Sequence, residues 1–146
     1  MDYSELAFEL LEKMQTLRKA KPQKNINDAL HGEAFVLNFI AVHGDEALPG
    51  EISQEMDVSS ARIAQALNSI ERKGWITREI DRNDRRKIIV RLTAEGKTEA
   101  DKHQRFIVGL TAKMLSLLGE EDAKEYIRIT SKLAELLIEF RETLEI

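Results

Sequence analysis

Residues 58–96 decide the fold, and they read VSSARIAQALNSIERKGWITREIDRNDRRKIIVRLTAEG. Apolar residues recur at helical spacing over residues 60–73, which predicts an amphipathic helix. Ser59 precedes it and is a favourable N-cap, because its hydroxyl can accept a hydrogen bond from a first-turn amide. Gly74 stands where a left-handed residue ends many helices. We therefore expect a short helix bounded closely at both ends.

A hairpin is expected directly after this helix. Residues 75–80 and 87–92 have the composition of two strands, and the second alternates in its apolar pattern. The six residues between them, DRNDRR, are too polar for anything but an exposed turn. Thr93 is expected to cap the next helix, with Glu95 in the first turn, where the helix dipole favours a negative charge. A helix followed by a hairpin and another helix is the order of a winged helix-turn-helix.

Helical patterns flank this segment on both sides. Apolar residues recur every three or four positions, which predicts helices over residues 2–21, 32–43, 49–56, 96–118 and 122–144. Residues 22–30 are interpreted as a polar connector. The long helices carry apolar stripes that need a partner, and in a chain of 146 residues a second copy of the same helices is expected. A monomeric helical bundle is the alternative.

The expected fold class is mainly α with a small β-wing (α+β). The whole chain, residues 1–146, is interpreted as one subunit. Within it, residues 32–96 form the predicted winged helix-turn-helix lobe that binds DNA. Residues 1–31 and 97–146 are the predicted dimerisation helices.

Composition narrows the functional classes. The chain has no cysteine, which excludes disulfides, thiolate metal sites and thiol-based redox sensing. No apolar run reaches the length of a membrane span, and no signal-peptide pattern is present, so a cytoplasmic protein without a membrane partner is expected. The formal net charge is −4, yet residues 59–97 hold ten Lys/Arg and only five Asp/Glu. Such a local basic surface suits nucleic acid, because phosphate neutralisation is local.

The predicted helix over residues 60–73 supplies candidates for base contacts. In a helix-turn-helix the second helix enters the major groove with its N-terminal residues nearest the bases. Arginine can bridge guanine O6 and N7, and glutamine can bridge adenine N6 and N7. Serines at a helix start suit phosphates. The candidates are Ser59, Ser60, Arg62, Gln65 and Ser69, and an ordinary solvated helix face is the alternative.

The tip of the predicted hairpin supplies candidates for phosphate contacts. Arginine suits phosphate forks and narrow minor grooves. The basic candidates in this wing are Arg82, Arg85, Arg86 and Lys87. Asp81 and Asp84 lie among them and are expected to brace the hairpin, with Asp84 holding either Arg86 or Arg82. A solvated run of charges is the alternative.

With these residues the chain resembles the MarR-type (multiple antibiotic resistance regulator) transcription factors over nearly its whole length. The most specific part is residues 70–97, IERKGWITREIDRNDRRKIIVRLTAEGK. It is similar to that family's wing tip, Asp-x-x-Asp-x-Arg, followed by Leu-Thr-x-x-Gly. The matching residues are Asp81, Asp84, Arg86, Leu92, Thr93 and Gly96.

The resemblance implies a homodimer with interlocked terminal helices that binds a pseudo-palindromic double-stranded operator, most often as a repressor. It also implies that a small phenolic or lipophilic effector could bind between the dimer helices and the DNA-binding lobes. Candidates for lining such a pocket are Phe8, Phe35, Phe39, Phe106 and Met114. Core packing is the preferred interpretation for each of them singly.

Three other functional classes are less well supported. The residues His31, Glu33, His43 and His103 could ligate a metal, but no two of them have tight helical ligand spacing, so neither a metal nor another cofactor is expected. No catalytic triad spacing, phosphate loop or HExxH motif is present, so an enzyme is not expected. A winged helix that binds only proteins remains an alternative, although the arginine-rich tip argues against it.

Overall fold

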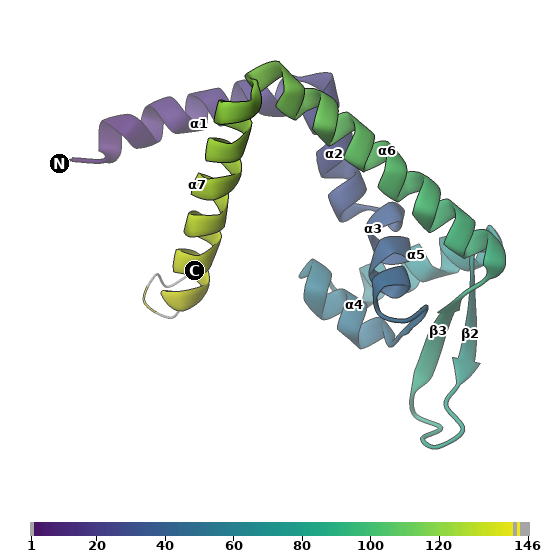
Figure 1. Ribbon diagram of the computed structural model, residues 1–146. Helices are drawn as coiled ribbons and strands as arrows, with labels where there is room; N and C mark the ends of the chain where they lie inside the picture. Colours follow the sequence, from purple (N-terminus) through teal and green to yellow (C-terminus); the bar gives the residue numbers. More distant parts are fainter. Residues whose placement is uncertain (1, 142, 144–146) are drawn as a thin grey trace. The chain divides into compact units, whose positions relative to one another are not determined.

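The computed structural model describes residues 2–141 and 143, with the side chains of residues 27–31 left aside. Its elements are α1 (Ser4–Lys19), α2 (Lys21–His31), α3 (Glu33–Val42), β1 (Glu46–Ala47), α4 (Pro49–Met56), α5 (Ser60–Arg72), β2 (Ile76–Ile80), β3 (Ile88–Leu92), α6 (Ala94–Leu118) and α7 (Glu120–Glu139). The chain forms two compact units, Met1–Val108 and Gly109–Ile146, and α6 runs from the first into the second. Figure 1 shows the elements, and the expected fold class, mainly helical with a small β-wing, is confirmed.

The sheet has three antiparallel strands in the order β1-β3-β2. Ile76 pairs with Leu92 at one end of the β2–β3 ladder and Ile80 pairs with Ile88 at the other. The hairpin projects away from the helices of its unit (Figure 1). The sequence did not predict β1, because two residues are too few to show a strand period.

One hydrophobic core holds the first unit together. It combines α3, α4, α5, the sheet and the first turns of α6. The buried members are Val36, Leu37, Phe39, Ile40, Ala47, Ile52, Ile63, Leu67, Ile70, Ile76, Val90, Leu92 and Ala100. The helix over Ser60–Arg72 and the hairpin therefore share one close-packed interior, which limits their movement against each other.

The start of α6 is fixed against the end of α5. The Thr93 hydroxyl donates to the Gly74 carbonyl oxygen (2.6 Å) and accepts from the Gly96 amide (3.0 Å). The Thr93 amide donates to the Trp75 carbonyl oxygen (3.0 Å). A Cβ on Gly96 would lie 1.9 Å from that same Trp75 oxygen. The predicted cap at Thr93 is confirmed, and the glycine permits the close approach.

The predicted bounds of two terminal segments were wrong. Residues 22–30 were expected to be a connector, but their backbone is helical. The break is the extended backbone at Ala20 (ψ 129°), and Pro22 lies in the first turn of α2, where proline needs no amide partner. The last helix ends at Glu139 with Phe140 as its cap, short of the predicted residue 144, which lies outside the described residues.

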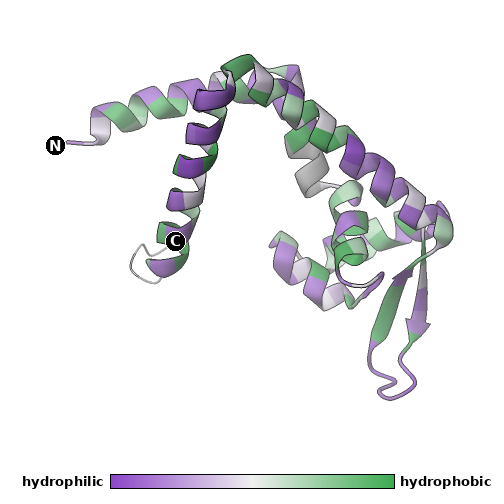
Figure 2. Ribbon diagram, in the orientation of Figure 1, coloured by the Kyte–Doolittle hydropathy of each residue, from purple (hydrophilic) through white to green (hydrophobic). Residues whose placement is uncertain are grey.

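The terminal helices expose the apolar stripes that the sequence predicted. Neither α1 nor α7 has a buried residue among those described. Their exposed apolar residues include Leu6, Phe8, Leu10, Met14, Leu17, Tyr126, Ile129, Leu133, Leu136, Leu137 and Phe140. Figure 2 shows hydrophobic and hydrophilic residues mixed along both helices. Within the part of the chain that is described, no helix is both long enough and apolar enough to cross a membrane.

Candidate nucleic-acid interface

A tight turn joins α4 to α5. Asp57 adopts the left-handed conformation (φ 53°, ψ 48°), which a short polar side chain tolerates better than most, and its amide donates to the Gln54 carbonyl oxygen. Ser59 then has extended backbone, and its Oγ accepts from the Arg62 amide at 3.2 Å. The predicted N-cap at Ser59 is confirmed. The two helices are thus joined by three residues, as in a helix-turn-helix.

Helix α5 has one buried and one exposed face. Ile63, Leu67 and Ile70 are buried, as the sequence predicted, and Gly74 has the expected positive φ of 79°. The exposed stripe opposite them consists of Ala61, Gln65, Asn68 and Arg72. Of these four residues only Gln65 is among the base-contacting residues predicted from the sequence. A helical wheel centred on the buried stripe would have identified the others.

The remaining predicted residues of α5 lie at its start or at one flank. Ser59, Ser60 and Arg62 are exposed. Ser69 is only half-exposed and was wrongly placed on the exposed face. It lies close to Glu33 of α3 and helps to lower the pKa of that carboxyl. The C-terminal part of this flank therefore lies beside the Glu33 side chain of α3.

Glu33 ties the C-terminal end of α5 to the start of α3. Lys73 Nζ lies 2.5 Å from Glu33 Oε2 and 5.0 Å from the ring centre of Trp75. Partial burial raises the pKa of the Glu33 carboxyl. Hydrogen bonds from Lys73 and Ser69 and the nearby positive charges outweigh that effect, so the pKa is lowered overall. Glu33 therefore stays ionised and holds this flank in place.

Backbone and aspartate hydrogen bonds shape the wing tip. The Asp81 amide donates to the Lys87 carbonyl oxygen, and the Lys87 amide donates to the Asp84 carbonyl oxygen, both at 2.9 Å. Asp81 Oδ1 accepts from the Asn83 amide (2.9 Å). Asp84 Oδ1 accepts from both the amide (3.1 Å) and the Nε (3.2 Å) of Arg86. Of the two partners considered for Asp84, the structure shows Arg86.

These contacts lower the pKa of the Asp84 carboxyl. The Arg86 amide contributes most, the Arg86 side chain next, and Lys87 adds a favourable charge. Asp84 is therefore an anion at neutral pH and restrains an arginine that is itself 92% exposed. Less rotamer freedom remains for Arg86 to lose when it binds an anion.

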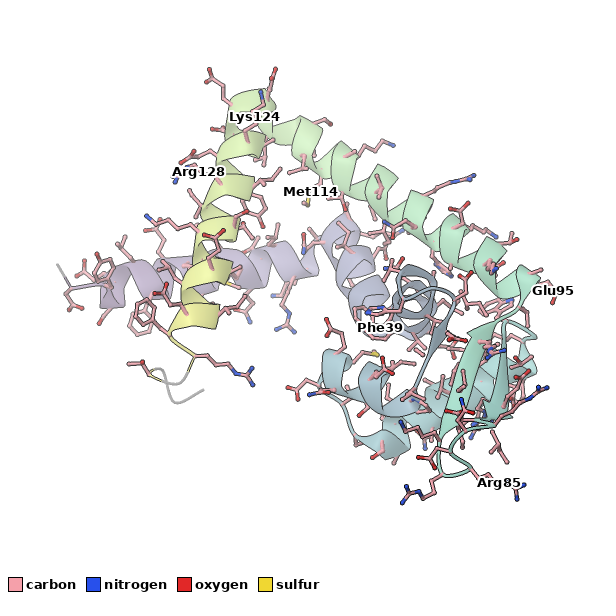
Figure 3. The ribbon with its side chains drawn as sticks, turned by 60° about the horizontal axis from the view of Figure 1, so that its bottom comes forward. Phe39, Arg85, Glu95, Met114, Lys124 and Arg128 are labelled. Atoms are coloured by element: carbon pink, nitrogen blue, oxygen red, sulfur yellow. The ribbon has the colours of Figure 1, made fainter. Side chains whose placement is uncertain are left out.

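The other basic residues of the tip point into solvent. Arg82, Arg85, Arg86 and Lys87 are all exposed, and Arg85 projects from the end of the hairpin (Figure 3). Four cations within six residues form an exposed concentration of positive charge. Exposed guanidinium groups of this kind suit phosphate oxygens, which they can bind with two parallel hydrogen bonds.

Arg78 of β2 bridges the wing to α5 and was missed from the sequence. Its Nε and Nη2 donate to the two carboxylate oxygens of Glu71 (3.1 and 2.9 Å), and Nη2 also donates to Asn68 Oδ1 (2.6 Å). The hydrogen bonds lower the pKa of Glu71 and raise that of Arg78. The strand period was the available signal, since Arg78 falls on the same face as the buried Ile76.

The candidate pocket residues do not form one described cavity. Phe39 is 8% exposed and belongs to the core, with its ring stacked on His43 (4.0 Å between centres) and beside Phe35. Phe8 and Phe106 are exposed. Met114 belongs to the second unit. Core packing accounts for Phe39 and, in part, for Phe35.

The candidate metal ligands lie apart or have other partners. Glu33 is paired with Lys73, and His43 Nδ1 is 2.7 Å from the Phe39 carbonyl oxygen. His103 Nε2 is 4.0 Å from Glu99 Oε2. The side chain of His31 lies outside the described residues. Among the side chains that are described, no group of three or more His, Asp or Glu could hold a metal ion.

Comparisons with known proteins agree with this geometry. A family model described as "MarR family" matches residues 25–87. The HTH-type transcriptional regulator YwhA of Bacillus subtilis is 29% identical over 143 residues, which cover 92% of this chain and all of that protein. The HTH-type transcriptional repressor MdtR of the same organism is 31% identical over 103 residues (70% of this chain, 66% of MdtR). The crystal structure of the YusO protein from B. subtilis superposes with a TM-score of 0.69 at 26% identity, covering 92% and 99% of the two chains.

Proposed function

The chain belongs to the MarR family of DNA-binding transcriptional regulators, and from that premise we propose that it is a homodimeric repressor of a pseudo-palindromic operator. Each protomer inserts α5 into a major groove, and the β2–β3 wing grips the flanking backbone. The protein performs no chemistry and needs no cofactor. Its proposed place of action is the cytoplasm, where its DNA lies.

One observation carries the proposal: the exposed stripe of α5 and the cationic wing tip belong to one unit with one core. Arg82, Arg85, Arg86 and Lys87 supply sequence-independent phosphate contacts. The exposed start of α5, with Arg62 and Gln65, supplies groups that can read base edges. The exposed arginine cluster beside such a helix argues against a module that binds only proteins.

The exposed apolar stripes support dimerisation. Large exposed apolar surfaces on a water-soluble protein mark interaction sites. In α7 the stripe includes Leu133, Leu136 and Leu137, and α1 carries a comparable one. A second copy provides an identical stripe, so an isologous twofold interface would bury the stripes of both protomers. We therefore propose that residues 1–31 and 97–146 dimerise and that residues 32–96 bind DNA.

A twofold dimer would present two α5 helices to successive major grooves, about 34 Å apart. A ligand can release such a dimer from the operator only if it binds more tightly to a form in which the spacing of the two DNA-binding lobes does not match the two major grooves. The proposed effector is a small phenolic or lipophilic molecule that binds beside the dimerisation helices. The repressor role rests on a relative, MdtR, that is named a repressor.

The test is a fluorescence-anisotropy titration of the purified protein. The duplexes are the region upstream of its own gene and a scrambled version, each at two salt concentrations. Tight, salt-sensitive binding to the first duplex alone is expected. Equally weak binding to both would mean that another operator must be selected from random duplexes. No binding at low salt would favour the protein-interaction alternative.

Two substitutions separate base contacts from phosphate contacts in the same assay. Arg62→Ala and Gln65→Ala are expected to alter sequence preference more than the dependence of affinity on salt. A change in the salt slope without any change in preference would place these residues on the phosphates.

A further inference from the structure

We infer that Asn68 reads a base that presents a hydrogen-bond acceptor, and that Arg78 of the wing strand sets the orientation of its amide. Asn68 lies in the exposed stripe of α5, and Arg78 Nη2 donates to its Oδ1 at 2.6 Å. The inference rests on the proposed function and adds to it the chemistry of one position in the operator.

The chemistry of arginine fixes which way the amide points. A guanidinium group has only donors, so the amide atom beside it must be the oxygen. Arg78 is itself held by the two carboxylate oxygens of Glu71, three residues after Asn68 on α5. Arg78 is 29% exposed in its side chain, so it is partly sheltered between the strand and the helix. The oxygen of Asn68 is thereby directed toward the wing strand.

The orientation has a consequence for base recognition. An asparagine that pairs with adenine through two bonds must offer its oxygen to the adenine amino group. With Oδ1 engaged by Arg78, the group that Asn68 offers to the groove is its NH₂ donor. The edges that present acceptors alone are guanine O6 and N7 and thymine O4, whereas adenine presents its N7 acceptor beside an amino donor that would face the NH₂ of Asn68, and cytosine presents only an amino donor. The preferred contacted base is therefore guanine or thymine.

Arg78 acts here as a positioning residue, because it acts through Asn68. The pair also connects the two elements of the interface directly, since Arg78 is on β2 and Asn68 is on α5. Loss of Arg78 would release the amide to rotate, and Asn68 could then present either its oxygen or its nitrogen. The base preference at one position would therefore weaken although the Asn68 side chain is still present.

The experiment selects binding sites from a randomised duplex with the full-length protein and compares the variants. Wild type is expected to select one base pair at one position of each half-site, with guanine or thymine on the strand that Asn68 contacts. Asn68→Ala is expected to reduce that preference about five- to tenfold, leaving the other positions unchanged. Asn68→Asp keeps an oxygen for Arg78 but replaces the donor by an acceptor, and is expected to shift that position toward cytosine.

Arg78→Ala is expected to relax the same position only, and to have no further effect there when combined with Asn68→Ala. The matched control is Arg91→Ala, which removes one positive charge from the neighbouring strand. Arg91 pairs with Glu46 and Glu79, and the strand register places it opposite Thr77. This control is expected to keep the selected sequence. Circular dichroism melts check that each variant is folded.

The outcomes separate this inference from the function on which it rests. If wild type selects no sequence, the proposed function fails. If wild type selects a site and Asn68→Ala keeps all its preferences, the inference fails while the function stands. Unchanged preference in Arg78→Ala would overturn the positioning role.

Discussion

Replacing Gly96 with alanine tests the junction at the start of α6. The added Cβ would lie 1.9 Å from the Trp75 carbonyl oxygen and 2.8 Å from its carbon. Contacts under 3.0 Å do not occur, so the two backbones must separate by at least 1.1 Å. That oxygen also accepts the Thr93 amide hydrogen bond, which the movement would break.

The cost can be worked from these contacts. Overpacking of this kind costs about 1–3 kcal/mol, at the upper end here because the neighbour is backbone. The lost hydrogen bond costs about 1 kcal/mol. Alanine gains about 0.8–1.0 kcal/mol over glycine in helix propensity, which partly offsets both. The net loss is about 2–3 kcal/mol, a fall in melting temperature of about 5–10 °C for a chain of this size.

The assay is a thermal melt followed by circular dichroism at one fixed protein concentration. The control is Gly50→Ala, because a Cβ at Gly50 of α4 meets no atom within 4 Å. It is expected to leave stability unchanged or raise it by up to about 1 kcal/mol. A Gly96→Ala protein that melts within about 1 °C of wild type would refute the close approach.

Three further predictions concern charge and assembly. Arg86→Ala is expected to weaken binding to every duplex and to reduce the slope of log affinity against log salt concentration by about 0.9. An unchanged slope in an anisotropy series would show that Arg86 does not contact a phosphate. Glu33→Gln is expected to be less stable than wild type above pH 4.5, by less than about 1 kcal/mol because the pair is partly exposed. Since the folded pKa of Glu33 is lowered, the difference should vanish as the pH falls through it, and equal melting temperatures at pH 7 would contradict the role of the Lys73 pair. The double variant Leu133→Glu, Leu137→Glu is expected to be monomeric in sedimentation velocity and to lose operator binding. An intact dimer would show that the apolar stripe of α7 is not part of the dimer interface.

Periodicity and end signals predicted the DNA-binding unit well. The buried residues of α5, the cap at Ser59 and the positive φ at Gly74 all follow from local rules, and the structure has them. The same is true of the cap at Thr93. These features depend on neighbours a few residues apart, which a single sequence displays.

Features that depend on distant partners could not be predicted in the same way. The connector predicted over residues 22–30 is instead helical: proline follows many helices but also suits a first turn, as Pro22 does in α2, whose Ile26 is buried. Ser69 was predicted as a base-contacting residue, but it is only half-exposed and lies close to Glu33 of α3. The strand period places Arg78 on the face of the buried Ile76, but it does not identify Glu71 and Asn68 of α5 as the partners of Arg78.

The Leu-Thr-x-x-Gly segment also sets the rotational phase of the helix that follows it. Thr93 fixes where α6 begins, and Gly96 fixes how closely its first turn approaches Trp75. Each residue of an α-helix advances by about 100°, so one residue inserted after Leu92 would turn every later side chain of α6 by that angle. Insertions at the wing tip leave this angle unchanged. Length variation in such chains is therefore expected at the tip of the hairpin and not at its base.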